Sequence, residues 1–459
     1  MDAAVFPPTR YERRLDAAAA RGDATAAAFA FAARAARAAV PATGAREAAL
    51  RDVAAGVAAP MLAAFVLWIL RDAAARGIVR VHFLARDGQV LHEIARRLVP
   101  RLPASAGGAI DVRYLAASRQ IWARAISDSA DHHWLWYGDL PDTSLDDVLR
   151  RLAVPADTVA AGLAALGFDP ADRDRPLAPA ELARLRAWLA GPGFAAVAAP
   201  ARAENRRRLL AHLAQEGVLD PGPAAIADLG WSGSLHDALA GLLATEGMAP
   251  VDCYLFGIER VKDTTWLDRR HGFYFDLNRG AGADIFDRAV DRRGFLEVFC
   301  AADHGTVTGL RDGADGRVEV ETDPAWAAPV AAWGLGTVRA TIAAFTEALD
   351  PVALSAADIL AFRPAIGDLL HDFWLRPEPA EARVWGAFPF NLGEGHGSFI
   401  APLAEPYALA DLGRGLRGAR IMRKHEHFWI EGALAATPAG LRTLLRTAQR
   451  MRRWRRVSR

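Results

Sequence analysis

Twice in this chain a short β-type run ends in a polar loop from which a helix begins. Residues 78–85 (IVRVHFLA) have strand character, and helical periodicity starts at residue 89, after Arg86, Asp87 and Gly88. Residues 224–228 (AAIAD) are followed by LGWSGS and a helical segment at 235–244. Two further strands are predicted at 111–116 and 251–258. Strands that alternate with helices indicate a doubly wound, mostly parallel α/β sheet.

The predicted sheet lies in the middle of the chain, which has 459 residues and room for two or three domains. Residues 1–77 are expected to form an N-terminal helical region. Residues 78–275 are expected to form the α/β core, with a helical insertion at about 121–220. Residues 276–459 complete the chain as an α+β C-terminal region, and hairpin-like stretches are predicted at 271–277 and 306–320.

Composition limits the function and the compartment. The chain has 55 Lys and Arg residues against 54 Asp and Glu residues, a balance that argues against a nucleic-acid binder. All but two of the basic residues are Arg, so a single arginine carries little information. Cys253 and Cys300 form neither a disulfide framework nor a CxxC zinc motif, which favours a cytoplasmic protein.

Two segments raise the question of membrane contact. Residues 53–70 carry no charge and just reach the length of a spanning helix, but the first half is Ala and Gly with Pro60 inside. We therefore expect a buried core helix that starts near Pro60. From residue 441 onward, apolar Leu and Trp residues recur at helical spacing, and eight arginines lie among them. This basic amphipathic helix either contacts the inner face of the cytoplasmic membrane or docks on the body of the protein.

The loop after the third predicted strand has the residues of a phosphate site. The backbone N–H groups of Ser232, Gly233 and Ser234 open a helix, and a helix N-terminus favours an anion. Gly230 permits a close backbone approach. Asp228 can accept hydrogen bonds from sugar hydroxyls or help to hold Mg²⁺. The structural alternative is a tight turn with a serine as the helix cap.

The loops after the first two strands add more donors. Arg86 offers a bidentate fork for phosphate oxygens, while Asp87 can bind a metal or take a proton. An Arg–Asp pair that caps the helix is the alternative. Ser118 and Arg119 follow the second strand. Because the carboxyl ends of parallel strands share one edge of a sheet, the three loops together indicate a ligand with two phosphate groups around a sugar.

These motifs resemble known enzymes. In their order, FLARDGQ, YLAASRQ, DLGWSGS and YLFGIER resemble type I phosphoribosyltransferases. With EVFCAADHGTVTG, they are similar to a bacterial family of polysaccharide-modifying proteins, many of which carry a haloacid-dehalogenase-type phosphatase domain. The resemblance spans about residues 60–309 and implies a phosphoribosyltransferase-like fold. Two positions depart from the usual pattern: Ala227 replaces one of two adjacent acids, and Trp231 stands where a small residue is normal.

The resemblance implies a glycan phosphoribosyltransferase. Such an enzyme moves 5-phosphoribose, with inversion, from phosphoribosyl pyrophosphate to a lipid-linked or free glycan of a growing capsule or O-antigen. A separate phosphatase would then remove the 5-phosphate to leave ribofuranose. Mg²⁺ is the implied cofactor, with Asp87 and Asp228 as its candidate ligands. The candidate donor-binding residues are Arg86, Gly88, Ser118, Arg119, Gly230, Trp231, Ser232, Gly233 and Ser234.

Several alternatives stay open. The general base for the acceptor hydroxyl is Asp87, Glu297 or His304, and Asp228 completes the set of candidate catalytic residues. A haloacid-dehalogenase-like phosphatase with Asp228 as nucleophile is a second hypothesis, which the missing second aspartate disfavours. A non-catalytic scaffold of membrane-proximal polysaccharide assembly is the third, and it does not require the three loops to converge.

Overall fold

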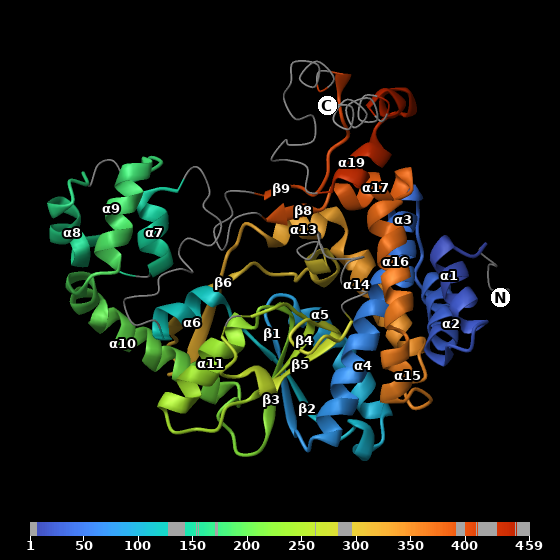
Figure 1. The fold of residues 1–459 in the computed structure, drawn as a ribbon, viewed down its shortest axis with the longest axis horizontal. Helices are drawn as coiled ribbons and strands as arrows, with labels where there is room; N and C mark the ends of the chain where they lie inside the picture. The colour runs from blue at the N-terminus through green and yellow to red at the C-terminus, as the bar shows by residue number, and fades with distance from the viewer. Residues whose placement is uncertain are drawn as a thin grey trace.

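The computed structural model describes residues 7–126, 143–152, 154, 156–169, 173–261, 263–282, 296–391, 400–409, 411, 429–445 and 447. At its centre is a parallel sheet of five strands in the order β2-β1-β3-β4-β5 (Figure 1). The strands are β1 (Arg80–Leu84), β2 (Asp111–Leu115), β3 (Ala224–Trp231), β4 (Asp252–Ile258) and β5 (Arg270–Asp276).

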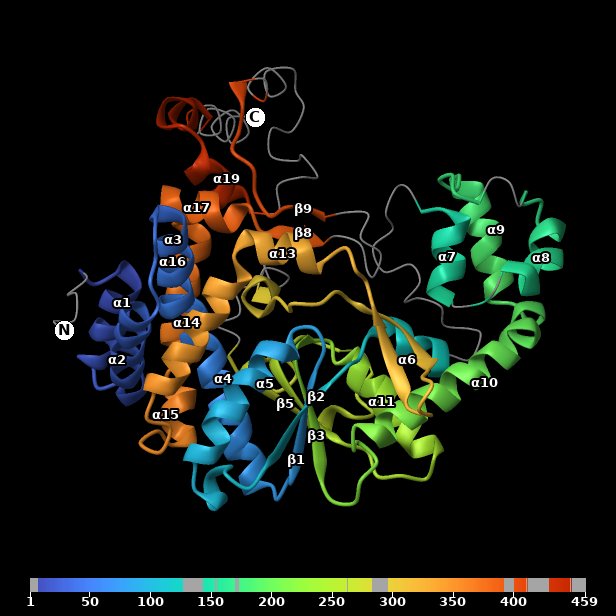
Figure 2. The same ribbon diagram turned by 180° about the vertical axis from the view of Figure 1, so that it is seen from behind.

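Alternating side chains of the strands build two separate cores. In β3, Ala225 and Ala227 face one core, and Ala224 and Ile226 face the other, as the two-residue period of a strand requires. Helices α4 (Ala59–Ala75) and α5 (Gly88–Leu98) cover the first face. Helices α6 (Arg119–Ile126), α10 (Pro192–Gln215) and α11 (Ser234–Thr245) cover the second (Figure 2). The expected doubly wound α/β fold is therefore present.

The strand order identifies the edge at which a ligand would bind. β1 pairs with β2 on one side and with β3 on the other, so the direction of the connections reverses at β1. This is the order of flavodoxin-like sheets, in which ligands occupy the crevice at the β1/β3 switch point. The loops that follow β1 and β3 flank this crevice.

The long apolar helix lies inside the protein. Helix α3 (Ala45–Val53), a π-helical turn (Ala54–Ala58) and α4 form one continuous stretch from Ala45 to Ala75. This stretch is long and apolar enough to cross a membrane, but its apolar window is wholly buried. Phe65 packs against Phe256 and Phe273 of the sheet, with ring centroids 5.5 and 5.6 Å apart. The buried core helix is confirmed: α4 begins at Ala59, next to Pro60, and the π-helical turn and α3 extend the helical stretch back to Ala45.

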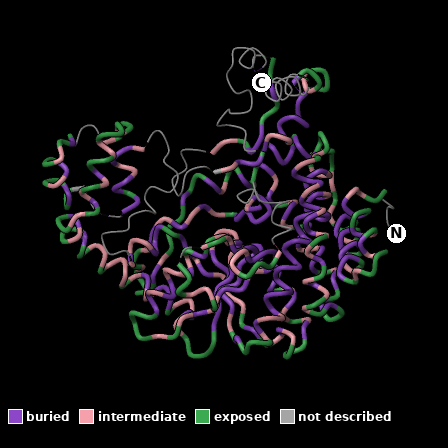
Figure 3. Tube along the Cα trace, viewed as in Figure 1, coloured by how far each residue is buried: buried purple, intermediate pink, exposed green. Residues whose placement is uncertain are grey.

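Helices from both ends of the chain share the core of α4 and α5 (Figure 3). From the N-terminal part these are α1 (Arg10–Ala19) and α2 (Ala24–Ala39), and the buried Arg37–Glu12 ion pair of 2.8 Å joins them. From the C-terminal part they are α13 (Ala327–Trp333), α14 (Leu335–Ala348), α15 (Ala356–Ala361), α16 (Arg363–Leu375), α17 (Pro379–Gly386) and α19 (Ile430–Ala436).

Three helices project from the body next to α10 (Figure 1). They are α7 (Leu145–Leu152), α8 (Ala156–Ala165) and α9 (Pro179–Leu189). They pack around a separate core that contains Leu149, Leu163 and Phe194. Short 3₁₀ turns elsewhere are Val99–Arg101, Ala104–Ala106 and Leu267–Arg269.

Two antiparallel pairs lie outside the main sheet: β6 (Val307–Asp312) with β7 (Val318–Thr322), and β8 (Pro389–Asn391) with β9 (Ile400–Pro402). The first is the hairpin expected at 306–320. The hairpin-like prediction for 271–277 is wrong, because this segment is β5, a parallel strand of the main sheet. The predicted basic end of the C-terminal helix lies outside the described residues.

Candidate active site

Three carboxylates from separate motifs share one electrostatic environment at the carboxyl ends of β1 and β3. Burial raises the pKa of Asp87 well above its usual value, and the charges of Glu297 and Asp228 raise it further. Burial also raises the pKa of Asp228, to about 7, although a 2.8 Å hydrogen bond donated by the Leu229 N–H opposes the shift. The structure therefore brings together three acids that lie far apart in the sequence.

Two arginines balance part of this negative charge. Arg86 directly precedes Asp87 and lowers its pKa, and Arg119 lowers the pKa of both Asp87 and Asp228. Arg119 is exposed at the start of α6. Ser118, in contrast, is buried, and its Oγ accepts a 3.2 Å hydrogen bond from the Ile121 N–H. Ser118 is thus the N-terminal cap of α6, a structural role that differs from the predicted contact with a ligand.

The helices after β1 and β3 begin without a side-chain cap from the described residues. The residue before α5 is Asp87, and the residue before α11 is Gly233. Neither a serine cap nor an Arg–Asp cap, the two structural alternatives for these loops, is observed. In α5 the Gln89 N–H donates a 3.0 Å hydrogen bond to the Arg86 carbonyl oxygen. The other first-turn N–H groups of the two helices are positioned to bind water or an anion. Ser232, two residues before α11, and Ser234, the first residue of α11, are exposed.

A buried arginine supports the loop at residues 232–234. Arg270, the first residue of β5, donates a 3.0 Å hydrogen bond to the Ser232 carbonyl oxygen and forms an ion pair with Asp237. Its Nε lies 3.3 Å from His236 Nδ1, and His236 Nε2 bonds to the Val251 carbonyl oxygen at 2.8 Å. Sequence reasoning missed Arg270, because nothing in the sequence distinguishes it from the many other arginines.

Two glycines in the loops lie so close to neighbouring atoms that a larger residue would clash. Gly233 has a φ of +75°, and an added Cβ would lie 2.8 Å from the Nε of Arg270. At Gly88, an added Cβ would lie 2.6 Å from the backbone carbon of Phe83. Gly88 therefore allows α5 to start close against β1, which is a packing role.

Gly230 and Trp231 belong to the sheet and not to a loop. β3 continues past Asp228, and these two residues pair with Gly257 and Ile258 of β4. The Trp231 ring stacks on Phe275 at 5.9 Å with an interplanar angle of 7°. The peptide bonds Ala85–Arg86 and Gly230–Trp231 are both cis. The loop between β3 and α11 is thus shorter than the sequence indicated.

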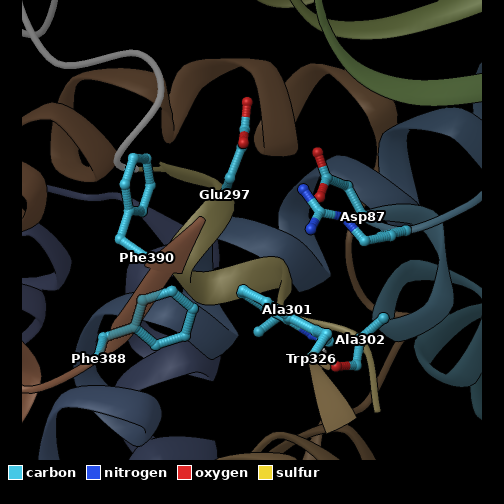
Figure 4. Close-up of a pocket in the computed structure, with 8 residues that line it drawn as sticks. Asp87, Glu297, Ala301, Ala302, Trp326, Phe388 and Phe390 are labelled. Carbon is cyan, nitrogen blue, oxygen red and sulfur yellow. Dashed lines mark hydrogen bonds between the residues drawn. The ribbon is translucent and has the colours of Figure 1, made fainter. Parts of the chain in front are cut away.

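A small pocket opens beside the carboxylates. Figure 4 shows Asp87 on one side, Phe388 and Phe390 on the other, and Glu297 between them. The guanidinium of Arg86 lies over the ring of Trp326, 5.0 Å from its centroid. The full lining is Arg86, Asp87, Glu297, Ala301, Ala302, Trp326, Phe388 and Phe390. Sequence reasoning missed the aromatic residues of this pocket, because they come from segments without a motif.

His304 lies nearby with both ring nitrogens engaged. Its Nδ1 is 2.8 Å from the Gly305 carbonyl oxygen, so this nitrogen carries the hydrogen. Its Nε2 is 2.6 Å from the hydroxyl oxygen of Tyr114 and accepts that hydrogen bond. Burial raises the pKa of Tyr114 above its usual value and the charge of Asp87 raises it further, which places the pair near the carboxylates. His304 therefore has no free nitrogen for a substrate proton in this arrangement.

A metal could be held here only together with other ligands. Among the described residues, no group of three or more His, Cys, Asp or Glu side chains is arranged as a metal centre. Mg²⁺, however, is usually held by one or two carboxylates together with substrate phosphates and water. Asp87 and Asp228 suit that role, because a divalent cation would relieve the repulsion that raises the pKa of Asp87.

No protein-family model matches the chain, and no curated protein is significantly similar to it. The geometry of this edge of the sheet is therefore the basis for a functional argument.

Proposed function

We propose that the protein is a Mg²⁺-dependent glycan phosphoribosyltransferase with the phosphoribosyltransferase-like arrangement that its motifs resemble. One observation carries the proposal: two uncapped helix N-termini follow the neighbouring strands β1 and β3, and the carboxylates Asp87 and Asp228 accompany them. A donor with phosphate groups at both ends of a sugar matches two anion sites with acids between them.

Each part of the donor has a candidate partner. The 5-phosphate would bind the N–H groups and hydroxyls at residues 232–234. Arg270 supports this loop through its hydrogen bond to the Ser232 carbonyl oxygen. Asp228 would accept hydrogen bonds from the ribose hydroxyls. The pyrophosphate would bind Arg86, Arg119 and the N-terminus of α5. Mg²⁺, held by Asp87 and Asp228 with the donor phosphates, would neutralise charge on the leaving group.

The transfer needs one proton acceptor. The bond between ribose C1 and the pyrophosphate oxygen breaks, the acceptor oxygen bonds to C1 from the opposite face, and the hydroxyl proton passes to a base. The products are the phosphoribosylated glycan, with inverted configuration at C1, and pyrophosphate. Of the three candidate bases we assign Glu297, because it lines the pocket beside Asp87, which is assigned to the metal.

Two observations count against the other hypotheses. A haloacid-dehalogenase-like phosphatase would need a second aspartate two residues after Asp228, and that position is Gly230. A scaffold does not require acids from separate motifs to converge, yet Asp87, Asp228 and Glu297 do. A separate phosphatase, a glycan acceptor at the cytoplasmic face of the membrane and contact through the basic C-terminal helix remain parts of the proposal.

The test is the release of pyrophosphate from phosphoribosyl pyrophosphate and Mg²⁺, with and without a glycan acceptor. We expect Asp228→Ala to lower the acceptor-dependent rate by about 100-fold or more, because it removes a charged contact to the reacting sugar. Asp315→Ala, in the exposed turn between β6 and β7, is the matched control and should retain the wild-type rate. Phosphate release without an acceptor would favour the phosphatase, and a protein that does not bind the donor would favour the scaffold.

A further inference from the structure

The side chain of Arg86 is oriented by an aromatic ring. Its guanidinium lies over Trp326, 5.0 Å from the ring centroid, and its Nη1 is buried with no hydrogen-bond partner among the described residues. A buried N–H group without a partner costs folding free energy, and an acceptor oxygen on a ligand would relieve that cost. The direction of this guanidinium therefore depends on where Trp326 is held.

Trp326 is itself held by the irregular segment 301–305. Its Nε1–H donates a 3.0 Å hydrogen bond to the carbonyl oxygen of Ala302. Ala301 and Ala302 lie beside Trp326 in the lining of the small pocket (Figure 4). Because this segment belongs to no helix or strand, its backbone groups need side chains as partners, and Arg339 donates a 2.9 Å hydrogen bond to the Ala301 carbonyl oxygen.

Gln89 joins the next residue of this segment to helix α5. Its Nε2 donates a 2.7 Å hydrogen bond to Asp303 Oδ1, and its Oε1 accepts a 3.1 Å hydrogen bond from the Asp303 N–H. The same Oε1 accepts a 2.6 Å hydrogen bond from Arg339. The backbone N–H of Gln89 donates to the Arg86 carbonyl oxygen at 3.0 Å. The network of contacts that begins at the side chain of Arg86 therefore returns to its backbone.

We propose that Gln89 is a positioning residue for Arg86, and that this network sets the affinity of the protein for pyrophosphate with Mg²⁺; the choice of pyrophosphate rests on the proposed function. A planar guanidinium binds two phosphate oxygens only when its N–H groups point in the right direction. The network fixes that direction relative to the N-terminus of α5, the other proposed contact of the pyrophosphate. The loop at residues 232–234 lies outside the network, so binding of the 5-phosphate should not depend on Gln89.

Calorimetric titration of the full-length protein at pH 8 tests this with two probes, inorganic pyrophosphate with Mg²⁺ and ribose 5-phosphate. Gln89→Glu places a second carboxylate against Asp303 and removes the donor between them. We expect it to weaken pyrophosphate binding by about tenfold and to leave the affinity for ribose 5-phosphate within about twofold. Gln89→Leu removes the amide without adding charge and should give the same selective loss, which separates positioning from simple repulsion of the anion.

Asp303 supplies both the matched control and the rescue. Asp303→Asn should bind pyrophosphate at least as tightly as the wild type, because the asparagine oxygen still accepts the Gln89 hydrogen bond. The double variant Gln89→Glu/Asp303→Asn exchanges donor and acceptor while the total charge stays that of the wild type. It should restore the pyrophosphate affinity to within about threefold of the wild-type value, since the two changes are coupled through one contact.

The two probes also separate this inference from the proposed function. If the wild type binds both probes, but the Gln89 variants keep their pyrophosphate affinity or lose both probes equally, the positioning role is overturned and the donor site stands. If the wild type binds neither probe, the donor site itself is wrong and the inference falls with it. Should Gln89→Leu misfold, Trp326→Phe keeps a ring under Arg86 without the N–H that holds Ala302, and the same selective loss is expected.

Discussion

Asp228 is the residue whose ionisation should be visible in the stability of the whole protein. Its pKa is raised to about 7 in the folded state, mainly by burial. An acid of this kind stabilises the fold fully below the pKa of the unfolded chain, about 4, and loses that contribution as the pH rises towards 7. At alkaline pH the folded protein must hold the charge of Asp228 at the full energetic cost.

We therefore expect Asp228→Asn to be more stable than the wild type at pH 8, by on the order of 3 kcal/mol, with the difference disappearing near pH 4. The amide oxygen can still accept the Leu229 N–H bond that Asp228 accepts. Chemical denaturation of both proteins across this pH range measures the difference. Asp315→Asn serves as the exposed control, and a stability difference that does not change with pH would contradict the assignment.

At the residue scale, the sequence indicated the acids and missed their surroundings. Asp87 and Asp228 could be predicted because each follows a strand and precedes a helix, a pattern with a physical reason. Arg270 and Phe390 could not, because their roles arise from contacts across the fold. Arg270 reaches Ser232 from β5, and Phe390 reaches the pocket from β8.

The element that most depends on local geometry is the turn from β3 into α11. Gly233 adopts a left-handed conformation there, against the buried guanidinium of Arg270. An alanine at this position would be strained by its φ and would force Arg270 to move.

We expect Gly233→Ala to lower the free energy of unfolding by about 1–3 kcal/mol and to weaken donor binding at least about tenfold. Thermal denaturation and calorimetric titration with phosphoribosyl pyrophosphate measure the two effects. Gly241→Ala in the middle of α11 is the control, since a Cβ there meets open space. Unchanged donor affinity for Gly233→Ala would argue against a phosphate at this turn.

The strands differed in how well the sequence predicted them. β1, β2 and β4 agree with their predicted bounds to within two residues, because apolar β-type runs end at clear polar loops. β3 runs three residues further than expected, since Gly230 and Trp231 still pair with β4. β5 looked like half of a hairpin, because among the described residues only a 3₁₀ turn, Leu267–Arg269, lies between it and β4, and its parallel pairing is a tertiary property.

At the scale of the whole molecule, one helix connects the sheet to the rest of the core. Phe65 of α4 contacts two aromatic residues of β4 and β5, Phe256 and Phe273. Helices from both ends of the chain pack against the same core. The stability of the sheet edge that carries the candidate site therefore depends on packing between the sheet and α4.

Phe65→Ala should destabilise the protein by about 3–5 kcal/mol through the cavity that it leaves. Phe31→Ala, which removes an exposed ring from α2, should change the free energy of unfolding by less than about 0.5 kcal/mol. Denaturant unfolding compares the two variants. Equal effects would mean that the packing around Phe65 is looser than the structure indicates.

The adjacency of β1 and β3 also sets a length scale for the ligand. Neighbouring strands lie roughly 4.8 Å apart, but β3 continues three residues past the level at which β1 ends, so the loop at residues 232–234 starts roughly 10 Å further along the strand direction. A ligand with anionic groups at two ends can bridge this offset, whereas a ligand with a single phosphate group can contact only one of the two loops. Backbone hydrogen bonds between β1 and β3 fix the spacing of the two loops, so substitutions on the surface do not change it.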